Sequence, residues 1–211
     1  MGFLNHPTVL LVLRELLGYI PKGKVILEKI PPTVSDVTEW YHTSGIHPRV
    51  SQIWVICNYQ AISPLLKQWK YTTNPEVQTF LLSTFRDGLC ELPELSKKSY
   101  ILPIPLGIDR WMERGFNQSV VLAKVAKKTF GVGYFPWCFR FWSGKHQSTL
   151  TKDERQKRML NFWIPPWIRV PQHIVLIDDV ISTGSTLHSC AEYLIKRGCK
   201  RITVIALARS S

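Results

Sequence analysis

Residues 175–187, VLIDDVISTGSTL, constrain the fold of this chain more than any other segment. The apolar run 174–177 is short and rich in β-branched residues, which predicts a strand that is buried on both faces of a parallel sheet and ends at Asp178. From Leu187 the apolar spacing becomes helical, and Gly198 is a candidate C-cap. Residues 182–186 are therefore expected to form a strand-to-helix turn at the carboxyl edge of the sheet, where open α/β proteins bind their ligands.

This turn is suited to hold a phosphate group. A helix N-terminus presents backbone N–H groups that have no partner inside the helix and that favour an anion. Gly184 allows the backbone to approach a ligand closely. Further hydrogen-bond donors are the hydroxyl groups of Ser182, Thr183, Ser185 and Thr186.

The adjacent acids Asp178 and Asp179 would repel a phosphate, so we expect them to bind a different group. Ionised carboxylates accept strong hydrogen bonds from hydroxyl groups, and a sugar diol fits this requirement. Phosphate and diol together describe a ribose 5-phosphate group. The segment resembles the 5-phosphoribosyl-1-pyrophosphate (PRPP) motif of type I phosphoribosyltransferases, in which an apolar strand precedes two acids, two apolar residues and a T-x-G-type loop.

Two other interpretations of this segment remain. The acids could form the Walker B pair of a nucleotide hydrolase, but the chain contains no G-x-x-x-x-G-K-[ST] sequence. An ordinary strand-turn-helix with a Ser or Thr N-cap explains one hydroxyl residue, but neither the acid pair nor the glycine.

A second segment with candidate ligand-binding residues is PIPLGIDRWMERGFNQS, at 103–119, between a predicted strand and a predicted helix. Arg110 and Arg114 could bind a pyrophosphate, since guanidinium groups are suited to phosphate oxygens, and Gly115 would permit a close approach. The alternative is a helix-entry loop whose arginines are solvated.

These residues narrow the resemblance to one family. P-[IV]-P followed by R-G-F-N-Q and a helix resembles the ComF (competence protein F) family, and Pro103, Pro105 and residues 114–118 match it. Together with residues 59–71 and the acid pair, the likeness covers about residues 53–209. It implies a phosphoribosyltransferase fold, PRPP bound with Mg²⁺ but without direct protein ligands to the metal, and a role in DNA uptake during natural transformation. The partners that it implies are single-stranded DNA and a DNA-translocating helicase.

The segment 145–162, KHQSTLTKDERQKRMLNF, resembles another family pattern, Q-T-x-L-s-x-x-E-R-x-x-N. Arg158 stands where the pattern has Asn, and Asn161 follows three residues later. In type I transferases the corresponding region is mobile and closes over the donor, which suits the polar and basic character of this segment. An exposed helix with Glu154 and Arg158 paired is the alternative. The candidate mobile-loop residues are Lys145, Gln147, Arg155 and Arg158.

The rest of the chain alternates between strand and helix patterns. Strands are expected at 53–57, 100–106, 134–141, 173–178 and 202–208, and helices at 61–71, 75–89, 114–130 and 185–197. This alternation predicts an α/β fold with a doubly wound, mostly parallel sheet. We expect a domain at 51–211 and an extension at 1–50, with a helix at 5–20 and irregular structure after it.

Cysteine usage and hydropathy predict a zinc-free, cytoplasmic protein without membrane insertion. The ComF family usually begins with a cysteine-rich zinc domain, but the five cysteines here include no C-x-x-C pair, so no zinc is expected. We expect the extension at 1–50 to be a replacement for that domain or a degenerate form of it. Its longest apolar run, 9–13, is too short to span a membrane.

The formal charge of +12 is more than a small ligand requires. Between Arg140 and Arg169 the chain has seven Lys or Arg residues and two acids, which favours a polyanionic partner, most simply nucleic acid. A solvated basic surface is the alternative. Most of the eight tryptophans are expected in the core. The candidates for contact with single-stranded nucleic acid are Trp142, Trp163, Trp167 and Lys157.

Three functional hypotheses follow from the sequence. The first is a ComF-like phosphoribosyltransferase that binds PRPP with Mg²⁺ and assists DNA uptake, with an unknown acceptor and no assigned catalytic residue. The second is a non-catalytic PRPP sensor that binds nucleic acid. The third, a nucleobase-salvage enzyme, is disfavoured because Ser182 stands where the purine-salvage branch has an Asp general base.

Overall fold

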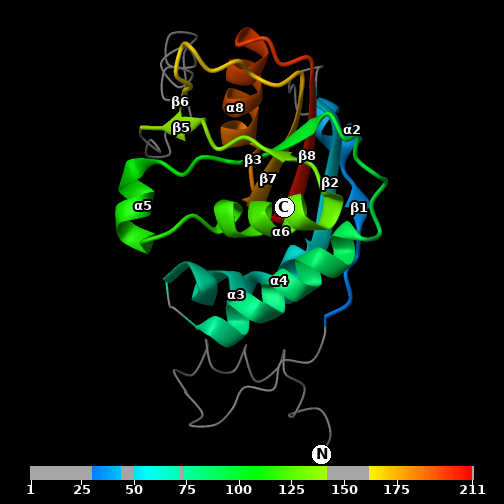
Figure 1. The fold of residues 1–211 in the computed structure, drawn as a ribbon. Coiled ribbons are helices and arrows are strands. Elements are labelled where there is room, and N and C mark those ends of the chain that lie inside the picture. The colour runs from blue at the N-terminus through cyan, green and yellow to red at the C-terminus, as the bar shows by residue number, and fades with distance from the viewer. Residues whose placement is uncertain (1–29, 44–49, 72–73, 142–161, 211) are drawn as a thin grey trace, which may run out of the picture.

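A six-stranded sheet in the order β1-β2-β8-β7-β3-β4 forms the centre of the molecule (Figure 1). The computed structural model describes residues 30–43, 50–71, 74–141 and 162–210. β1 pairs antiparallel with β2, and the remaining neighbours are parallel. The expected α/β fold with a mostly parallel sheet is confirmed. The strands are β1 (Ser35–Asp36), β2 (Val50–Asn58), β3 (Ser99–Pro103), β4 (Gly133–Tyr134), β7 (His173–Ile181) and β8 (Arg201–Arg209).

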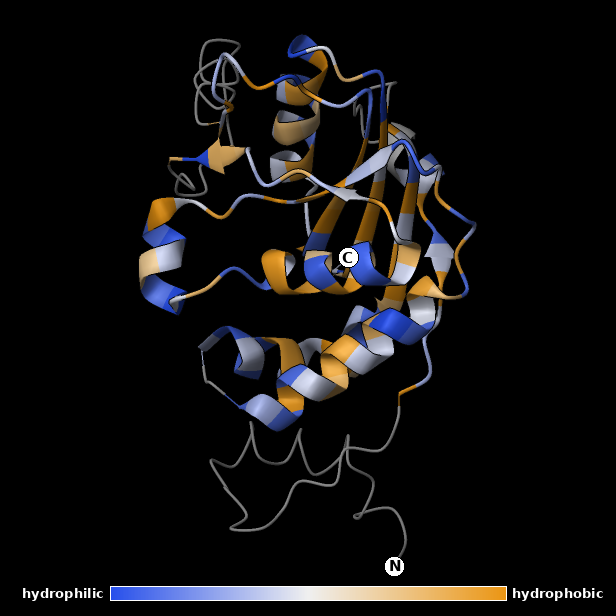
Figure 2. Cartoon of the chain, in the orientation of Figure 1, coloured by the Kyte–Doolittle hydropathy of each residue, from blue (hydrophilic) through white to orange (hydrophobic). Residues whose placement is uncertain are grey.

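Helices cover both faces of this sheet. On β7, Val175 and Ile177 pack with the apolar residues of α3 (Tyr59–Tyr71), α4 (Pro75–Leu89) and α6 (Gln118–Phe130). Ile174 and Leu176 face the opposite side, where α8 (Ser185–Lys196) packs. Trp40 of the short helix α2 (Thr38–Thr43) packs against the hydrophobic core on the α8 side of the sheet. Figure 2 shows the apolar residues concentrated on the central strands, as expected for a sheet buried on both faces.

The helix expected at 114–130 begins four residues later, at Gln118, and Arg114 belongs to a separate short helix. A short helix, α5 (Ile108–Arg114), ends at Gly115, whose φ of +75° breaks the helical path. The chain is then extended at Asn117, whose side-chain oxygen caps the start of α6 at Gln118. The physical reason for the difference is that a left-handed glycine ends the first helix and an N-cap residue only two positions later starts the second.

Two strand predictions also need correction. β7 continues past Asp178 to Ile181, because Val180 and Ile181 pair with Ala208 and Arg209 of β8. The single strand expected at 134–141 is divided, since β4 joins the main sheet whereas β5 (Phe139–Arg140) pairs antiparallel with β6 (Phe162–Trp163). Pro136 lies between β4 and β5 and has no N–H group to donate to a strand neighbour.

The described part of the N-terminal extension packs on the main sheet. Residues 35 and 36 pair with Val55 and Trp54 of β2. The domain division at residue 50 remains a prediction, and the helix expected at 5–20 lies outside the described residues. Within the described ranges, no helix has both the length and the apolar character that a membrane crossing needs.

Candidate functional site

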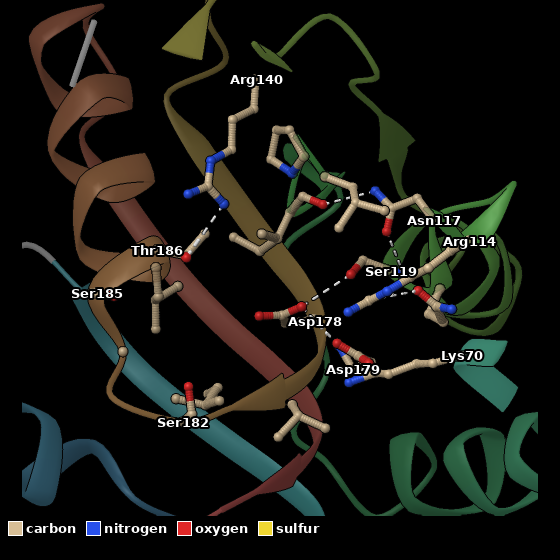
Figure 3. Close-up of a pocket in the computed structure, with 18 residues that line it drawn as sticks. Lys70, Arg114, Asn117, Ser119, Arg140, Asp178, Asp179, Ser182, Ser185 and Thr186 are labelled. Atoms are coloured by element: carbon tan, nitrogen blue, oxygen red, sulfur yellow. Dashed lines mark hydrogen bonds and ion pairs between the residues drawn. The ribbon is translucent and has the colours of Figure 1, made fainter. Parts of the chain in front are cut away.

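A pocket of about 170 Å³ lies at the carboxyl edge of β7, where segments distant in sequence meet (Figure 3). The end of β7 and the turn before α8 form one part of its wall. The rest is formed by the end of α3, the loop after β3, the last residue of α5, the start of α6 with its N-cap, and one residue of β5. The polar side chains lining it include Lys70, Arg114, Asn117, Gln118, Ser119, Arg140, Asp178, Asp179, Ser182, Ser185 and Thr186.

The two acids lie at the centre of this pocket. Asp178 is half-buried, and its Oδ1 accepts hydrogen bonds from the Ser119 hydroxyl at 3.0 Å and from the Asp179 backbone N–H at 2.9 Å. Burial and the Asp179 carboxylate raise the pKa of Asp178 to about 7, against the opposing effects of the two hydrogen bonds and the Lys70 charge. Near neutral pH, the Asp178 carboxyl group is therefore protonated in part of the molecules.

Asp179 has a cationic partner. Its side chain is mostly buried, and Oδ2 lies 2.7 Å from the Lys70 ammonium group, which reaches across the pocket from the last turn of α3. The ion pair compensates part of the cost of burying a carboxylate.

The turn before α8 has the conformation expected of an anion-binding segment. Gly184 is the N-cap at φ +70°, a region that favours glycine. Four of its five predicted residues, Ser182, Gly184, Ser185 and Thr186, line the pocket, and the Thr186 hydroxyl accepts a hydrogen bond from Arg140 at 3.4 Å. Thr183 is not among the lining residues. Its hydroxyl instead donates to the Ser185 hydroxyl at 3.2 Å, within the turn.

The structure separates the predicted pyrophosphate residues. Arg114 lines the pocket, with its guanidinium 5.9 Å from the centre of the Tyr71 ring. Arg110 does not line it and pairs with Glu113 at 3.0 Å in an exposed position. Gly115 lies beside a second, apolar pocket. Of the three residues, Arg114 alone lines the first pocket, and its contact with an anion there stays a prediction.

Five polar pocket residues were not among the predicted site residues. Lys70, Asn117 and Gln118 lie in segments that were noted only for their family likeness. Ser119 directly follows the R-G-F-N-Q segment, and Arg140 contributed only to the basic charge. Ser119 and Asp178 are 59 positions apart, so no local spacing relates them. Only the packing of α3, α6 and β5 around the end of β7 brings these residues together.

The second pocket, of about 770 Å³, adjoins the first. Both are lined by Pro105, Leu106, Asn117 and Arg140. Trp163 lies in this pocket's wall, and its ring centre is 5.8 Å from that of Phe139. Other predicted residues lie outside the described part of the chain, namely Trp142, Lys145, Gln147, Arg155, Lys157 and Arg158.

The donor set of the first pocket is compatible with a magnesium ion that arrives with its ligand. Within the described ranges no group of three or more His, Cys, Asp or Glu side chains could hold a metal ion by itself. Mg²⁺ is commonly held by one or two carboxylates together with phosphate oxygens of the substrate. Asp178 and Asp179 would be the nearest carboxylates to such an ion.

Comparison with known proteins finds similar sequences. The phosphoribosyl transferase domain model matches residues 170–211, which include the acid pair and the turn. The competence protein ComFC of Streptococcus pneumoniae is 29% identical over 71% of this chain and 64% of its own length. The DNA utilization protein YhgH of Escherichia coli K12 is 26% identical over 71% of this chain and 67% of its own. ComFC of Bacillus subtilis is 31% identical over 63% of this chain and 53% of its own.

Similar solved structures are phosphoribosyltransferases. A hypoxanthine phosphoribosyltransferase from Staphylococcus aureus is 17% identical, with a TM-score of 0.39 over 63% of this chain and 62% of that chain. An adenine phosphoribosyltransferase from Saccharomyces cerevisiae is 15% identical, with a TM-score of 0.40 over 82% of this chain and 90% of that chain. These likenesses are too distant to carry an argument about the site. The chain spans 64% of the length of the S. pneumoniae relative, and its sequence is similar to the ComFC and YhgH proteins over part of their length.

Proposed function

We propose that the pocket binds PRPP together with Mg²⁺. The observation that carries the proposal is an acid pair between two anion-binding walls (Figure 3). The turn before α8 and Arg140 lie on one side of Asp178, and Arg114 lies on the other. PRPP has this order of groups, with a ribose diol between a 5-phosphate and a pyrophosphate. The turn would hold the 5-phosphate, the acids the diol and Arg114 the pyrophosphate.

Unpartnered donors support an anion beside Arg114. Arg114 Nε and Gln118 Nε2 are buried and have no hydrogen-bond partner among the described residues. A buried donor without a partner costs about 1 to 3 kcal/mol, so an acceptor at this place is strongly favoured. Gln118 is 1% exposed and lines the pocket, so its position is fixed by the fold before any ligand arrives. A pyrophosphate oxygen is an acceptor of suitable charge.

The chemistry available to these side chains is positioning and charge stabilisation. Breaking the bond from ribose to pyrophosphate leaves positive charge on the ribose ring and negative charge on the leaving group. Arg114 would stabilise the leaving group, while the acids hold the ring. Mg²⁺ bound to the pyrophosphate would supply further charge neutralisation. Ser182 is an exposed hydroxyl residue and a poor base, which disfavours oxopurine salvage.

We also propose a role in DNA uptake or utilisation in the cytoplasm. The relatives are named as competence and DNA utilization proteins. The formal charge of +12 favours contact with a polyanion such as single-stranded DNA. The contact would involve the basic segment 140–169 with Trp142, Lys157 and Trp163, and a DNA-translocating helicase would be the protein partner. Measurement of turnover distinguishes PRPP as a phosphoribosyl donor from PRPP as a regulatory ligand.

Calorimetric titration of PRPP with Mg²⁺ tests the pocket. We expect micromolar binding by the wild type and at least about a 100-fold loss in Asp178→Asn/Asp179→Asn, because two charge-assisted hydrogen-bond acceptors are removed. The matched control is Glu91→Gln/Glu94→Gln, which removes the same charge from two exposed acids outside the pocket. It should bind PRPP as the wild type does.

The outcomes separate the hypotheses. A wild type that does not bind PRPP, or a double variant that binds it equally well, contradicts the proposal. If binding is confirmed, pyrophosphate release in the presence of nucleobases distinguishes transfer from sensing. Release that requires the acid pair would identify a transferase, whereas tight binding without release would favour the sensor.

A further inference from the structure

Lys70 makes an unusual contact for a residue in the last turn of a helix. Its ammonium group lies 2.7 Å from Asp179 Oδ2, and its side chain is only 20% exposed. The helix end is fixed, since Trp69 is buried and its indole N–H donates to Gln78 at 3.2 Å. The backbone of Lys70 is thereby anchored. Its flexible four-carbon side chain still allows the ammonium group to contact different anions nearby.

This contact competes with the proposed ligand. Asp179 Oδ2 is a natural acceptor for a sugar hydroxyl, but Lys70 already occupies it. A neutral diol is a weaker partner for a carboxylate than an ammonium ion. A ligand that binds the acids must therefore either leave Lys70 in place and lose one acceptor, or give the ammonium group another anion.

Arg114 indicates where that anion would lie. Its guanidinium sits 5.9 Å from the ring centre of Tyr71, the residue after Lys70, and both cations line the same pocket. Figure 3 shows the side chains of Lys70 and Arg114 on the same side of Asp178, away from the turn before α8. A diphosphate bound to Arg114 would bring negative charge within reach of Lys70.

We propose that Lys70 determines ligand specificity by exchanging Asp179 for the diphosphate group of the ligand. This inference rests on the proposed function. With PRPP, the ammonium group moves to a diphosphate oxygen and releases Asp179 Oδ2 to the diol. With ribose 5-phosphate, no diphosphate is available, so Lys70 stays on Asp179 and competes with the sugar. The exchange thus favours the intact donor over the sugar phosphate that remains after pyrophosphate is lost.

Titrations of Lys70→Gln with three ligands test this exchange. Mg²⁺–PRPP and Mg²⁺–pyrophosphate should each bind about 10- to 100-fold more weakly, because a charge-assisted contact is lost. Ribose 5-phosphate should bind as tightly as to the wild type, or more tightly. Lys67→Gln removes an equal charge from an exposed site on α3 that is not in the pocket, and should leave the affinities unchanged. Lys70→Arg keeps a cation and should recover most of the preference for PRPP.

Several results would overturn the inference. Equal weakening for PRPP and ribose 5-phosphate would make Lys70 a structural counter-ion. If Lys70→Gln binds PRPP and ribose 5-phosphate more tightly by the same factor, Lys70 only competes with the diol for Asp179. If the wild type binds pyrophosphate but not PRPP, the proposed function fails, and an unchanged pyrophosphate affinity in Lys70→Gln then refutes the role of Lys70 separately. Should Lys70→Gln not fold, the inference requires that Lys70→Arg fold and retain the preference of the wild type for PRPP.

Discussion

At the scale of single residues, we expect Asp178 to lower the free energy of unfolding, although it contributes to ligand binding. Its pKa is raised to about 7 by burial and by the Asp179 carboxylate. Between pH 4 and pH 7 the folded chain therefore binds more protons at this site than the unfolded chain, so the free energy of unfolding falls as pH rises through that range. Asp178→Asn removes this ionisation and should stabilise the protein by on the order of 1 kcal/mol more at pH 8 than at pH 5.

Urea unfolding of the wild type and Asp178→Asn at both pH values measures this difference. Glu91→Gln, at an exposed acid outside the pocket, is the control and should show no comparable dependence on pH. A stability difference for Asp178→Asn that is the same at the two pH values would contradict the argument.

The residues that sequence could identify are those whose chemistry is local. Asp178, Asp179 and the turn residues follow one another along the chain, and a single strand-turn-helix places most of them at the pocket. Lys70, Ser119 and Arg140 reach the same pocket from three other elements, and only tertiary packing selects them. Arg110 shows the converse case, since it lies on the short helix α5 and its side chain pairs with Glu113 instead of lining the pocket.

At the scale of elements, Asn117 connects α6 to the loop after β3. Its Oδ1 accepts a hydrogen bond from the Ser119 N–H at 3.0 Å, and its Nδ2 donates to the Ile104 carbonyl at 3.0 Å. Asn117→Ala removes both bonds and should lower the free energy of unfolding by about 1 to 3 kcal/mol. Asn117→Ser retains a capping oxygen and should recover about 1 kcal/mol of this loss.

The two variants separate helix capping from loop positioning. Neither side chain can bond the Ile104 carbonyl as Asn117 does, so both variants should bind PRPP more weakly than the wild type, by about tenfold. Urea unfolding and calorimetric titration measure the two effects. If Asn117→Ser restores PRPP affinity together with stability, the bond to Ile104 is unimportant for the pocket.

Element boundaries were harder to predict than element types, because capping residues and strand pairing decide where an element ends. The helix expected at 114–130 had the right type, but a left-handed Gly115 and the cap at Asn117 divide that region. β7 gained three residues because its register with β8 continues to Arg209, which the apolar run alone does not reveal. Backbone pairing and capping thus decided where elements end, whereas hydrophobic periodicity decided what they are.

At the scale of the whole molecule, the alternation of strands and helices predicted the parallel sheet but not its strand order. β2 precedes β3 in the chain, yet β8 and β7 lie between them in the sheet. This order puts the acid pair of β7 beside the carboxyl end of β3, so residues from two loops can act on one ligand.

The net charge of +12 yields a last prediction, which concerns single-stranded DNA. The logarithm of the association constant should fall linearly with the logarithm of salt concentration, by about 0.7 per phosphate contact. Fluorescence anisotropy of a labelled oligonucleotide measures this slope. Lys157→Gln/Arg158→Gln should reduce its magnitude by about 1.4, whereas Trp163→Ala should weaken binding about tenfold without changing it, because stacking releases no counterions.

The matched control for the charge variant is Lys127→Gln/Lys128→Gln, at exposed residues in the last turn of α6. It removes the same net charge and should leave the slope nearly unchanged, because counterion release counts only the cations that contact phosphates. Equal reductions by both double variants would show that charge acts diffusely over the surface. A slope near zero in the wild type would exclude phosphate contacts altogether, and the basic composition would then be a property of the solvated surface.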